Sequence, residues 1–347
     1  MNKKVKILLI VISITVFFYI GYYFINRDNN LINITSLSKE FVDTYYNELS
    51  RIDSNDKKDN MLIVISPKKI KNTYGASNII EAPNNQYILQ YDSKELKDKA
   101  LLELKNDKHI KSVEENETTE LFESSGTSES NYNSWGIEKM SLNTASDFAN
   151  SQELNNVNVA IIDTGLDVLL FNKYYSSKLS GTYNVLDNST SLEDTDGHGT
   201  HIAGTIAEST PNNVKILPIK VSTNGTMYIT DIVAAINYIV YNKNADVINM
   251  SFGSYYNSES LEQAIVSANS NNIICVAAAG NENTSRLSYP ASYDTTISVS
   301  SIDSELNRSS FSNYGSKITF AAPGTNIKSI MGKNTDISIK NGNNDDD

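Results

Sequence analysis

The sequence has 347 residues, which is enough for two domains and a large buried core. Its 41 acidic residues outnumber the 29 basic ones, and the resulting net charge of −12 argues against a nucleic-acid partner. With Cys275 as the only cysteine, a disulfide framework and a cysteine-based metal site are excluded, and three histidines do not favour a multi-histidine metal site.

The N-terminus is typical of an export signal. Lys3, Lys4 and Lys6 precede an uncharged apolar stretch over residues 7–26, which is long enough to span a bilayer. No small-residue cleavage pattern follows, so residues 1–28 are predicted to be a signal anchor, with a cleaved signal peptide as the alternative. Because the lysines stay inside, we expect the remainder on the extracellular side of the cell membrane, anchored or secreted.

Residues 33–115 are expected to form a small α+β domain. Apolar residues at helical spacing predict one helix over residues 38–52. Asp92 or Ser93 can cap a second amphipathic helix, which follows directly. Compact or alternating apolar runs predict three strands, at residues 61–65, 87–91 and 109–114.

Two different patterns follow this domain. Residues 116–133 are acidic, rich in Ser and Thr and without apolar periodicity, which predicts an exposed linker and the place of any maturation cleavage. Over residues 134–347, apolar strands alternate with amphipathic helices, which predicts a three-layer α/β domain with a parallel sheet covered on both faces. Its functional loops should lie at the C-terminal edge of the strands. The expected strands are residues 157–162, 214–221, 247–251, 273–278, 297–301 and 318–321, and the expected helices are residues 198–208, 230–241 and 258–270.

Two polar side chains stand where such loops begin. Asp163 ends an apolar run, and His198 opens a helical run within Asp-Gly-His-Gly-Thr-His. At this edge of a parallel sheet a carboxylate can fix the tautomer of an imidazole and stabilise its cationic form. Asp163 alone would also fit an ordinary turn, and a single Asp-Thr-Gly lacks the second copy that an aspartic protease needs. His201 is expected to be a packing or hydrogen-bonding residue.

Together and in this order, the segments around Asp163 and His198 resemble the Asp and His motifs of the subtilisin-like serine proteases. The resemblance implies the three-layer subtilisin-like fold, hydrolysis of peptide bonds in a peptide or protein substrate, and no cofactor for the chemistry. Asp163 would orient His198, and His198 would act as the general base. The domain over residues 33–115 looks like the family's propeptide, an intramolecular inhibitor, with an accessory domain as the alternative. Similar small peptidases remove leader peptides from lantibiotics, so leader removal and general extracellular proteolysis both stay open.

Further segments match the same family. The segment over residues 277–282 follows a predicted strand, and the resemblance places Asn281 where its amide would donate to a developing oxyanion. Gly-Asn pairs also form ordinary turns. The segment over residues 249–253 resembles the strand of the substrate-binding cleft that pairs with an extended substrate. The segment over residues 224–227 resembles the opposite edge of the same cleft. The expected substrate-binding residues are Ser251, Phe252, Gly253, Gly225 and Thr226.

The third member of the expected triad is missing from this sequence. The family's Gly-Thr-Ser-x-Ala-x-Pro motif should continue from Gly342, but Asn344 stands at the position of the serine. Since an amide cannot supply the attacking alkoxide, the sequence predicts an endopeptidase truncated before its nucleophile. The alternative is an inactive pseudoprotease or gene fragment that at most binds peptides. The connection over residues 209–214 is short, so the family's usual calcium loop is expected to be absent, and a structural calcium ion is left open without support from the sequence.

Overall fold

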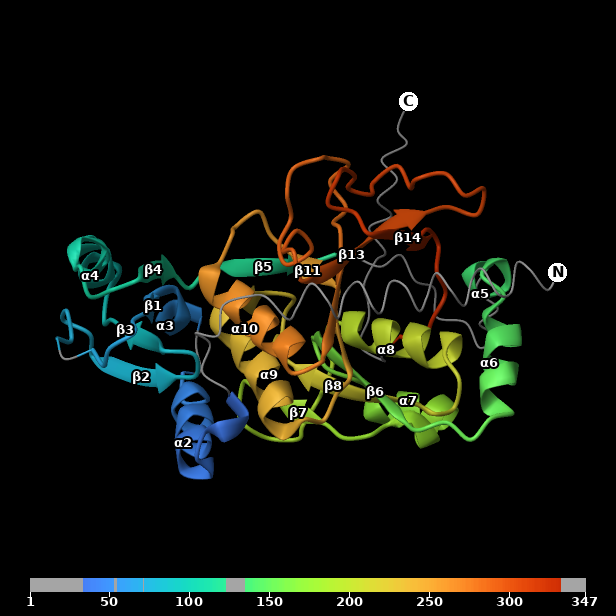
Figure 1. Cartoon of the computed structure of the whole chain (residues 1–347), viewed down its shortest axis with the longest axis horizontal. Helices are drawn as coiled ribbons and strands as arrows, with labels where there is room; N and C mark the ends of the chain where they lie inside the picture. The colour runs from blue at the N-terminus through green and yellow to red at the C-terminus, as the bar shows by residue number, and fades with distance from the viewer. Residues whose placement is uncertain (1–33, 53–54, 71, 123–134, 332–347) are drawn as a thin grey trace. The chain divides into compact units, whose positions relative to one another are not determined.

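The computed structural model describes residues 34–52, 55–70, 72–122 and 135–331 (Figure 1). They belong to one compact unit, Asn33–Asp347. Within the described residues, no helix is both long and apolar enough to cross a membrane. The predicted signal segment over residues 1–28 and the expected serine position at Asn344 lie outside the described residues.

Residues 34–115 form a lobe around an antiparallel sheet with the strand order β2-β3-β1-β4. The strands are β1 (Met61–Ile65), β2 (Asn78–Ala82), β3 (Gln86–Gln90) and β4 (Ser112–Glu115), and the helices are η1 (Ile34–Ser36), α2 (Lys39–Leu49), α3 (Asn55–Asp59) and α4 (Lys94–Asn106). The central strand β1 is buried on both faces. Leu62 and Val64 belong to a core with the apolar face of α4, whereas Met61 and Ile63 join α2 in the main core of the chain.

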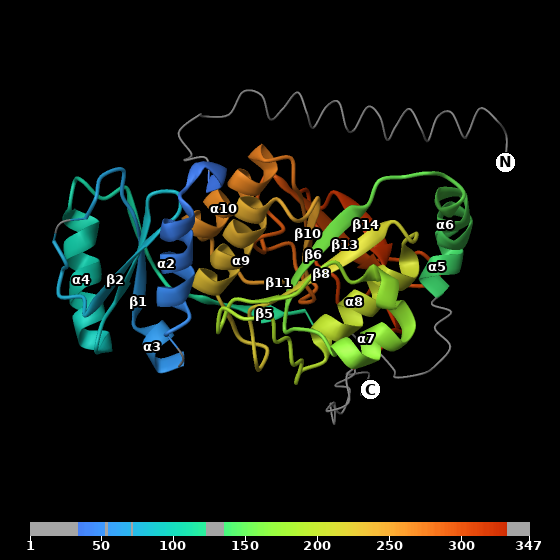
Figure 2. The ribbon, with the colours of Figure 1, turned by 90° about the horizontal axis from the view of Figure 1, so that it is seen from below.

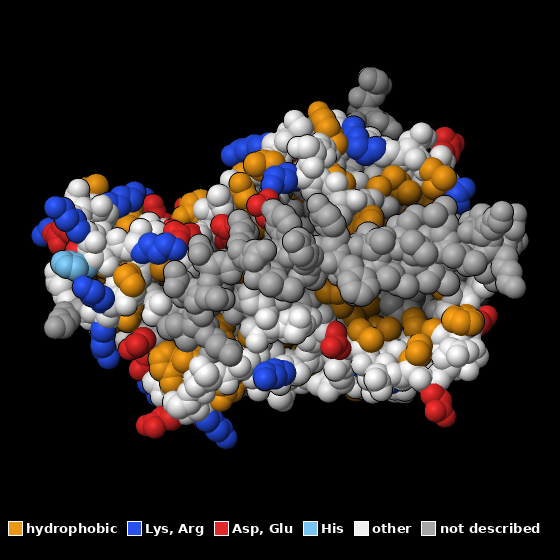
Figure 3. Space-filling model, in the orientation of Figure 1, with side chains coloured by type: hydrophobic (Ala, Val, Ile, Leu, Met, Phe, Trp, Pro, Cys, Tyr) orange, Lys and Arg blue, Asp and Glu red, His pale blue; other side chains and the backbone are white. Residues whose placement is uncertain are grey.

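The predicted elements of this lobe are confirmed with small shifts in their bounds. Ser93 caps α4, because its Oγ accepts a hydrogen bond from the Leu96 amide at 3.3 Å. The strand predicted over residues 109–114 begins only at Ser112, and β2 has no predicted counterpart. On the face shown in Figure 3, Lys and Arg side chains gather over the end of the lobe that carries α4. This end is therefore a charged, solvated surface.

The second part of the chain carries a seven-stranded parallel sheet with the order β14-β13-β12-β10-β6-β8-β7. Its strands are β6 (Val157–Asp163), β7 (Tyr183–Asn184), β8 (Val214–Lys220), β10 (Val247–Met250), β12 (Ile274–Ala278), β13 (Thr296–Ile302) and β14 (Phe320–Pro323). Its helices are α5 (Trp135–Lys139), α6 (Leu142–Asn150), α7 (Val168–Tyr175), η2 (Ser176–Lys178), α8 (His198–Ser209), α9 (Ile229–Asn242) and α10 (Glu259–Ser270). The predicted three-layer α/β domain is confirmed, and every predicted strand and helix of this part is present.

Alternate residues of β6 show how the layers are built. Ala160 and Ile162 belong to the main core with α9 and α10, whereas Val159 and Ile161 belong to a second core with α7 and α8. Figure 2 shows α9 and α10 on one side of β6 and β8, and α7 and α8 on the other. Because both faces are covered, the strand is apolar throughout, as its sequence indicates.

The predicted linker is wrong in part. Residues 118–121 form strand β5 (Thr118–Leu121), which lies between β9 (Met227–Tyr228) and β11 (Phe252–Gly253). Both pairings are antiparallel, and Figure 1 shows β5 beside β11. The strand escaped prediction because main-chain hydrogen bonds to two neighbours hold it, and only Thr119 among its side chains is fully buried. Residues 123–134 of the predicted linker lie outside the described residues.

Candidate active site

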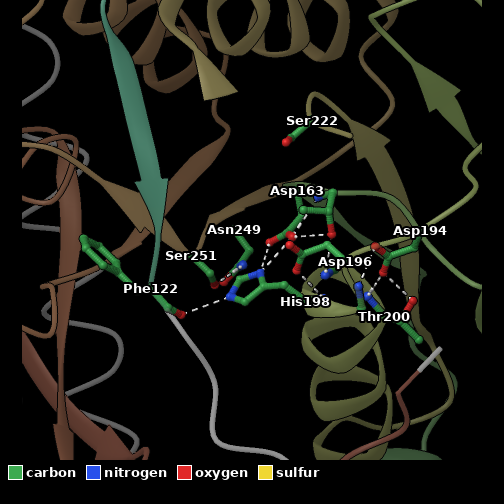
Figure 4. Close-up of polar contacts among 12 residues, drawn as sticks. Phe122, Asp163, Asp194, Asp196, His198, Thr200, Ser222, Asn249 and Ser251 are labelled. Atoms are coloured by element: carbon green, nitrogen blue, oxygen red, sulfur yellow. Dashed lines mark hydrogen bonds and ion pairs between the residues drawn. The ribbon is translucent and has the colours of Figure 1, made fainter. Parts of the chain in front are cut away.

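Asp163 and His198 meet at the C-terminal edge of the parallel sheet. The His198 Nδ1 lies 2.8 Å from Oδ1 of Asp163 and 3.0 Å from its Oδ2 (Figure 4). Asp163 is 1% exposed and His198 is 6% exposed. The predicted pair is therefore brought together, with the Nδ1–H of the imidazole donating to a buried carboxylate.

The local chain geometry explains this close approach. Asp163 is the last residue of β6, and the amide and hydroxyl of Thr164 both donate to its Oδ1. His198 begins α8, and Gly199 packs directly onto the turn after β6, where a Cβ would come within 2.4 Å of the Gly165 carbonyl oxygen. Glycine at position 199 is therefore required for the helix to begin this close to the carboxylate.

The electrostatics of the pair favour a charged imidazole. Burial by itself lowers the pKa of His198, but the negative charge of Asp163, its hydrogen bond and a hydrogen bond to the Phe122 carbonyl outweigh burial. The pKa of His198 rises from 6.5 to about 9. With Nδ1 against the Asp163 carboxylate and Nε2 against the Phe122 carbonyl, both ring nitrogens face acceptors, so the imidazole is held in its charged form in this arrangement.

A second carboxylate holds the beginning of α8. Asp194 accepts hydrogen bonds from the Gly197 amide at 2.9 Å, the Thr200 amide at 2.9 Å and the Thr200 hydroxyl at 2.6 Å. Asp196 accepts from the His198 amide at 3.2 Å. Sequence reasoning missed these residues, although acidic residues just before a helix are a known signal for capping.

Phe122 is the unexpected neighbour of His198. Its carbonyl oxygen lies 3.0 Å from the Nε2 of His198, at the end of β5 (Figure 4). The Phe122 amide donates to the carbonyl of Ser251 at 3.2 Å, and the Ser251 hydroxyl accepts from the Asn249 side chain at 2.9 Å. No signal in the sequence of the acidic segment marks Phe122, because its role arises only from the pairing of β5.

The predicted substrate-binding residues flank this strand. Phe252 pairs with Leu121 and Gly253 pairs with Glu120, while Ser251 precedes them. On the opposite side, Gly225 and Thr226 lead into β9, and a Cβ at Gly225 would lie 3.6 Å from the Leu121 side chain. The structure thus places both predicted edges against β5.

Asn281 lies in the turn after β12 and is half-buried. The buried side chain of Asn313 holds this turn: its Oδ1 accepts from the amides of Glu282 and Thr284, and its Nδ2 donates to the Ala279 carbonyl at 3.0 Å. Sequence reasoning missed Asn313, which lies far along the chain. The oxyanion role of Asn281 stays a prediction.

His201 is a buried structural residue. Its Nε2 donates to the Ile327 carbonyl at 3.2 Å, and burial lowers its pKa to about 4. Across the described part of the chain, no three His, Cys, Asp or Glu side chains group in a way that could hold a metal ion. The described residues therefore offer no cluster of acidic side chains for the structural calcium ion that the sequence left open.

Comparisons with known proteins find one matching family and several similar proteins. The Subtilase family matches residues 155–345. The "Thermostable alkaline protease" of Halalkalibacterium halodurans is 29% identical over 82% of this chain and 78% of its own length, and Subtilisin DY of Bacillus licheniformis is 37% identical over 53% and 70%. A crystal structure of the psychrophilic subtilisin-like protease Apa1 from Pseudoalteromonas sp. AS-11 is 32% identical, covering 55% of this chain and 45% of that one, with a TM-score of 0.48.

Proposed function

This chain belongs to the subtilase family of serine endopeptidases, and on that premise we propose that the structure is an inhibited precursor. Residues 34–122 act as a propeptide, and β5 blocks the substrate cleft. Asp163 orients His198, His198 is the general base, and Asn281 donates to the developing oxyanion.

The position of β5 carries the proposal. An extended segment that adds a strand between two edges is how a peptidase cleft holds its substrate, and β5 pairs in this way with β9 and β11. It brings one carbonyl, that of Phe122, to hydrogen-bond distance of the imidazole of His198. The peptide bond after Phe122 is therefore the one placed for attack.

The strand also indicates which substrates fit. The ring of Phe122 lies against Gly253, where a Cβ would come within 2.6 Å of its Cζ, so this wall is shaped for a flat aromatic side chain. Three residues earlier, Thr119 is 1% exposed opposite Met227, and its hydroxyl is without a hydrogen-bond partner. We expect substrates with an aromatic residue before the cut and a small apolar residue, such as valine, at the position of Thr119.

Buried polar contacts fasten the propeptide to the catalytic domain. The carboxylate of Glu114 accepts from the Ser258 hydroxyl at 2.9 Å and from the amides of Glu259 and Ser260 at the start of α10. A carboxylate is favourable there because it compensates the free amides of the first helical turn. Lys58 and Asp231 add a buried ion pair at 2.6 Å.

The maturation site is tested on protein isolated from its natural source. Where the gene encodes the missing serine segment, cleavage after Phe122 predicts a mature chain whose N-terminal residue is Glu123, which intact-mass and N-terminal peptide spectrometry would detect. A mature chain that retains β5, or one cut several residues away from Phe122, would contradict the assignment of the cleavage site.

Blocking by β5 is tested with a matched pair of variants in the full chain. Thr119→Glu places a charge at a buried position, whereas Thr118→Glu places the same charge on the exposed side of the strand. A fluorescent peptide with the sequence of residues 117–122 should bind the Thr119→Glu chain and not the Thr118→Glu chain. Equal binding to both variants would show that β5 does not block the cleft.

The nucleophile needs a separate experiment. The Gly-Thr-Ser-x-Ala-x-Pro segment is not among the 347 residues, and Asn344 is not described by the structure. Sequencing the gene past codon 347 tests for a Thr-Ser-x-Ala-x-Pro segment in any frame. Labelling of the 347-residue chain by an active-site phosphonate would contradict the prediction that this sequence lacks the nucleophile.

The N-terminal sequence supports a location for the reaction. The basic and apolar segment at residues 1–28 supports export, with the catalytic domain outside the cell and the segment as its membrane anchor. Leader-peptide removal and general proteolysis are both compatible with the expected cleavage preference. Fractionation of cells into membrane and medium, followed by detection of the chain, tests the anchor.

A further inference from the structure

A buried ammonium group lies at the far end of the helix that begins with His198. Lys178, the last residue of η2, is 5% exposed. Its Nζ lies 2.6 Å from the Ala207 carbonyl oxygen, 2.6 Å from the Thr210 carbonyl oxygen, 3.1 Å from the Thr210 hydroxyl and 3.1 Å from the Pro211 carbonyl oxygen. Four oxygens from the end of α8 and the segment after it therefore surround one positive charge.

The oxygens converge because the helix ends there. The last carbonyls of an α-helix have no partner within the helix, and the helix dipole places partial negative charge at this end. Ala207 is in the last turn of α8, and the chain then bends towards β8 through Thr210 and Pro211. None of the four oxygens is ionised, so the site compensates a cation by dipoles alone.

We propose that these four oxygens form a binding site for one small monovalent cation, and that the ammonium group of Lys178 fills it in this chain. Distances of 2.6–3.1 Å are those of N–H···O hydrogen bonds to an ammonium group, and none of the four ligands is a carboxylate, which calcium and magnesium favour. The geometry suits an ammonium ion or a cation of similar size, such as potassium. The end of the His198 helix is thereby fixed without a dissolved ion.

In the alternative explanation, Lys178 stabilises the fold only through the packing of its aliphatic chain. The two explanations differ when the side chain is removed. A cation site leaves an oxygen cage that a dissolved cation can enter, whereas lost packing cannot be restored by any salt.

The test is chemical rescue of the full-length Lys178→Ala chain. Leaving the four oxygens without a hydrogen-bond donor should lower the midpoint of thermal unfolding by about 5–10 °C in choline chloride. Ammonium, ethylammonium or potassium chloride at the same ionic strength should restore at least half of that loss, and tetramethylammonium, which is too large, should restore none. The unchanged chain should show no difference among these salts, because its site is already filled.

Lys215→Ala is the matched control. Lys215 also donates to two main-chain carbonyls, those of Ser177 and Asn212, but it is only half-buried, and its removal takes away a like charge that lowers the pKa of Lys178. It should lose little stability and respond equally to all the salts. If the Lys178→Ala chain does not fold in choline, recovery of folded protein in ammonium, ethylammonium or potassium but not in tetramethylammonium supports the site. Equal behaviour in every salt, folded or not, overturns it.

Discussion

The charge state of His198 should depend chiefly on Asp163. Replacing Asp163 by Asn keeps the shape of the side chain but removes the negative charge that lies 2.8 Å from the imidazole. Burial then acts on the His198 pKa with much less opposition, and burial lowers it. We expect the pKa of His198 to fall from about 9 to below 6.5.

The size of this change follows from the two pKa values. A difference between 6.5 and about 9 corresponds to about 3 kcal/mol of preference for the charged imidazole in the folded chain. Since the folded-state pKa is raised, this stabilisation is fully present below pH 6.5 and is lost as the pH rises through about 9. The advantage of the natural chain over Asp163→Asn in unfolding free energy should therefore shrink by about 3 kcal/mol between these limits.

Two measurements check this prediction. An NMR titration of the ring protons reads the pKa of His198 directly, and only three histidines contribute signals. Urea unfolding at pH values below 6.5 and above 9 reads the stability. Asp196→Asn is the control, because Asp196 raises the His198 pKa less than Asp163 does. A His198 pKa that stays near 9 in Asp163→Asn, or falls equally in both variants, would refute the reasoning.

Two further predictions concern contacts that hold the lobe of residues 34–115 against α9 and that hold the turn after β12. Lys58→Met leaves the carboxylate of Asp231 buried and unpaired and should lower the free energy of unfolding in urea by about 3–5 kcal/mol. Lys69→Met removes one partner of an exposed ion pair and should lower it by less than about 1 kcal/mol. Similar losses of stability in the two variants would contradict the role of burial. Asn313→Ala removes the acceptor of the Glu282 amide and should destabilise the chain by about 2–3 kcal/mol. Hydrogen exchange at the Glu282 amide should become faster. Unchanged exchange there would show that Asn313 does not hold the turn after β12.

Regular apolar patterns made much of the fold predictable. Strand β6 is apolar throughout because both of its faces are covered. Helices α8 and α10 show the helical spacing of one buried face, whereas α9 is buried on nearly every side. The strand-end Asp163 and the helix-start His198 could be paired in advance, because parallel strands bring their C-terminal ends to one edge. Elements that are short, such as β9 and β11, carry too few residues to show a pattern.

The sequence by itself determined the class of fold and two residues of the candidate active site, because each depends on local patterns. Only the tertiary structure decided that Phe122 faces His198, that Asn313 holds the turn of Asn281, and that Lys178 fills the oxygen cage after α8. Each of these contacts joins residues far apart in the chain through main-chain oxygens and amides, which every residue carries. Such groups leave no trace in the order of side chains, so only folding shows which of them meet.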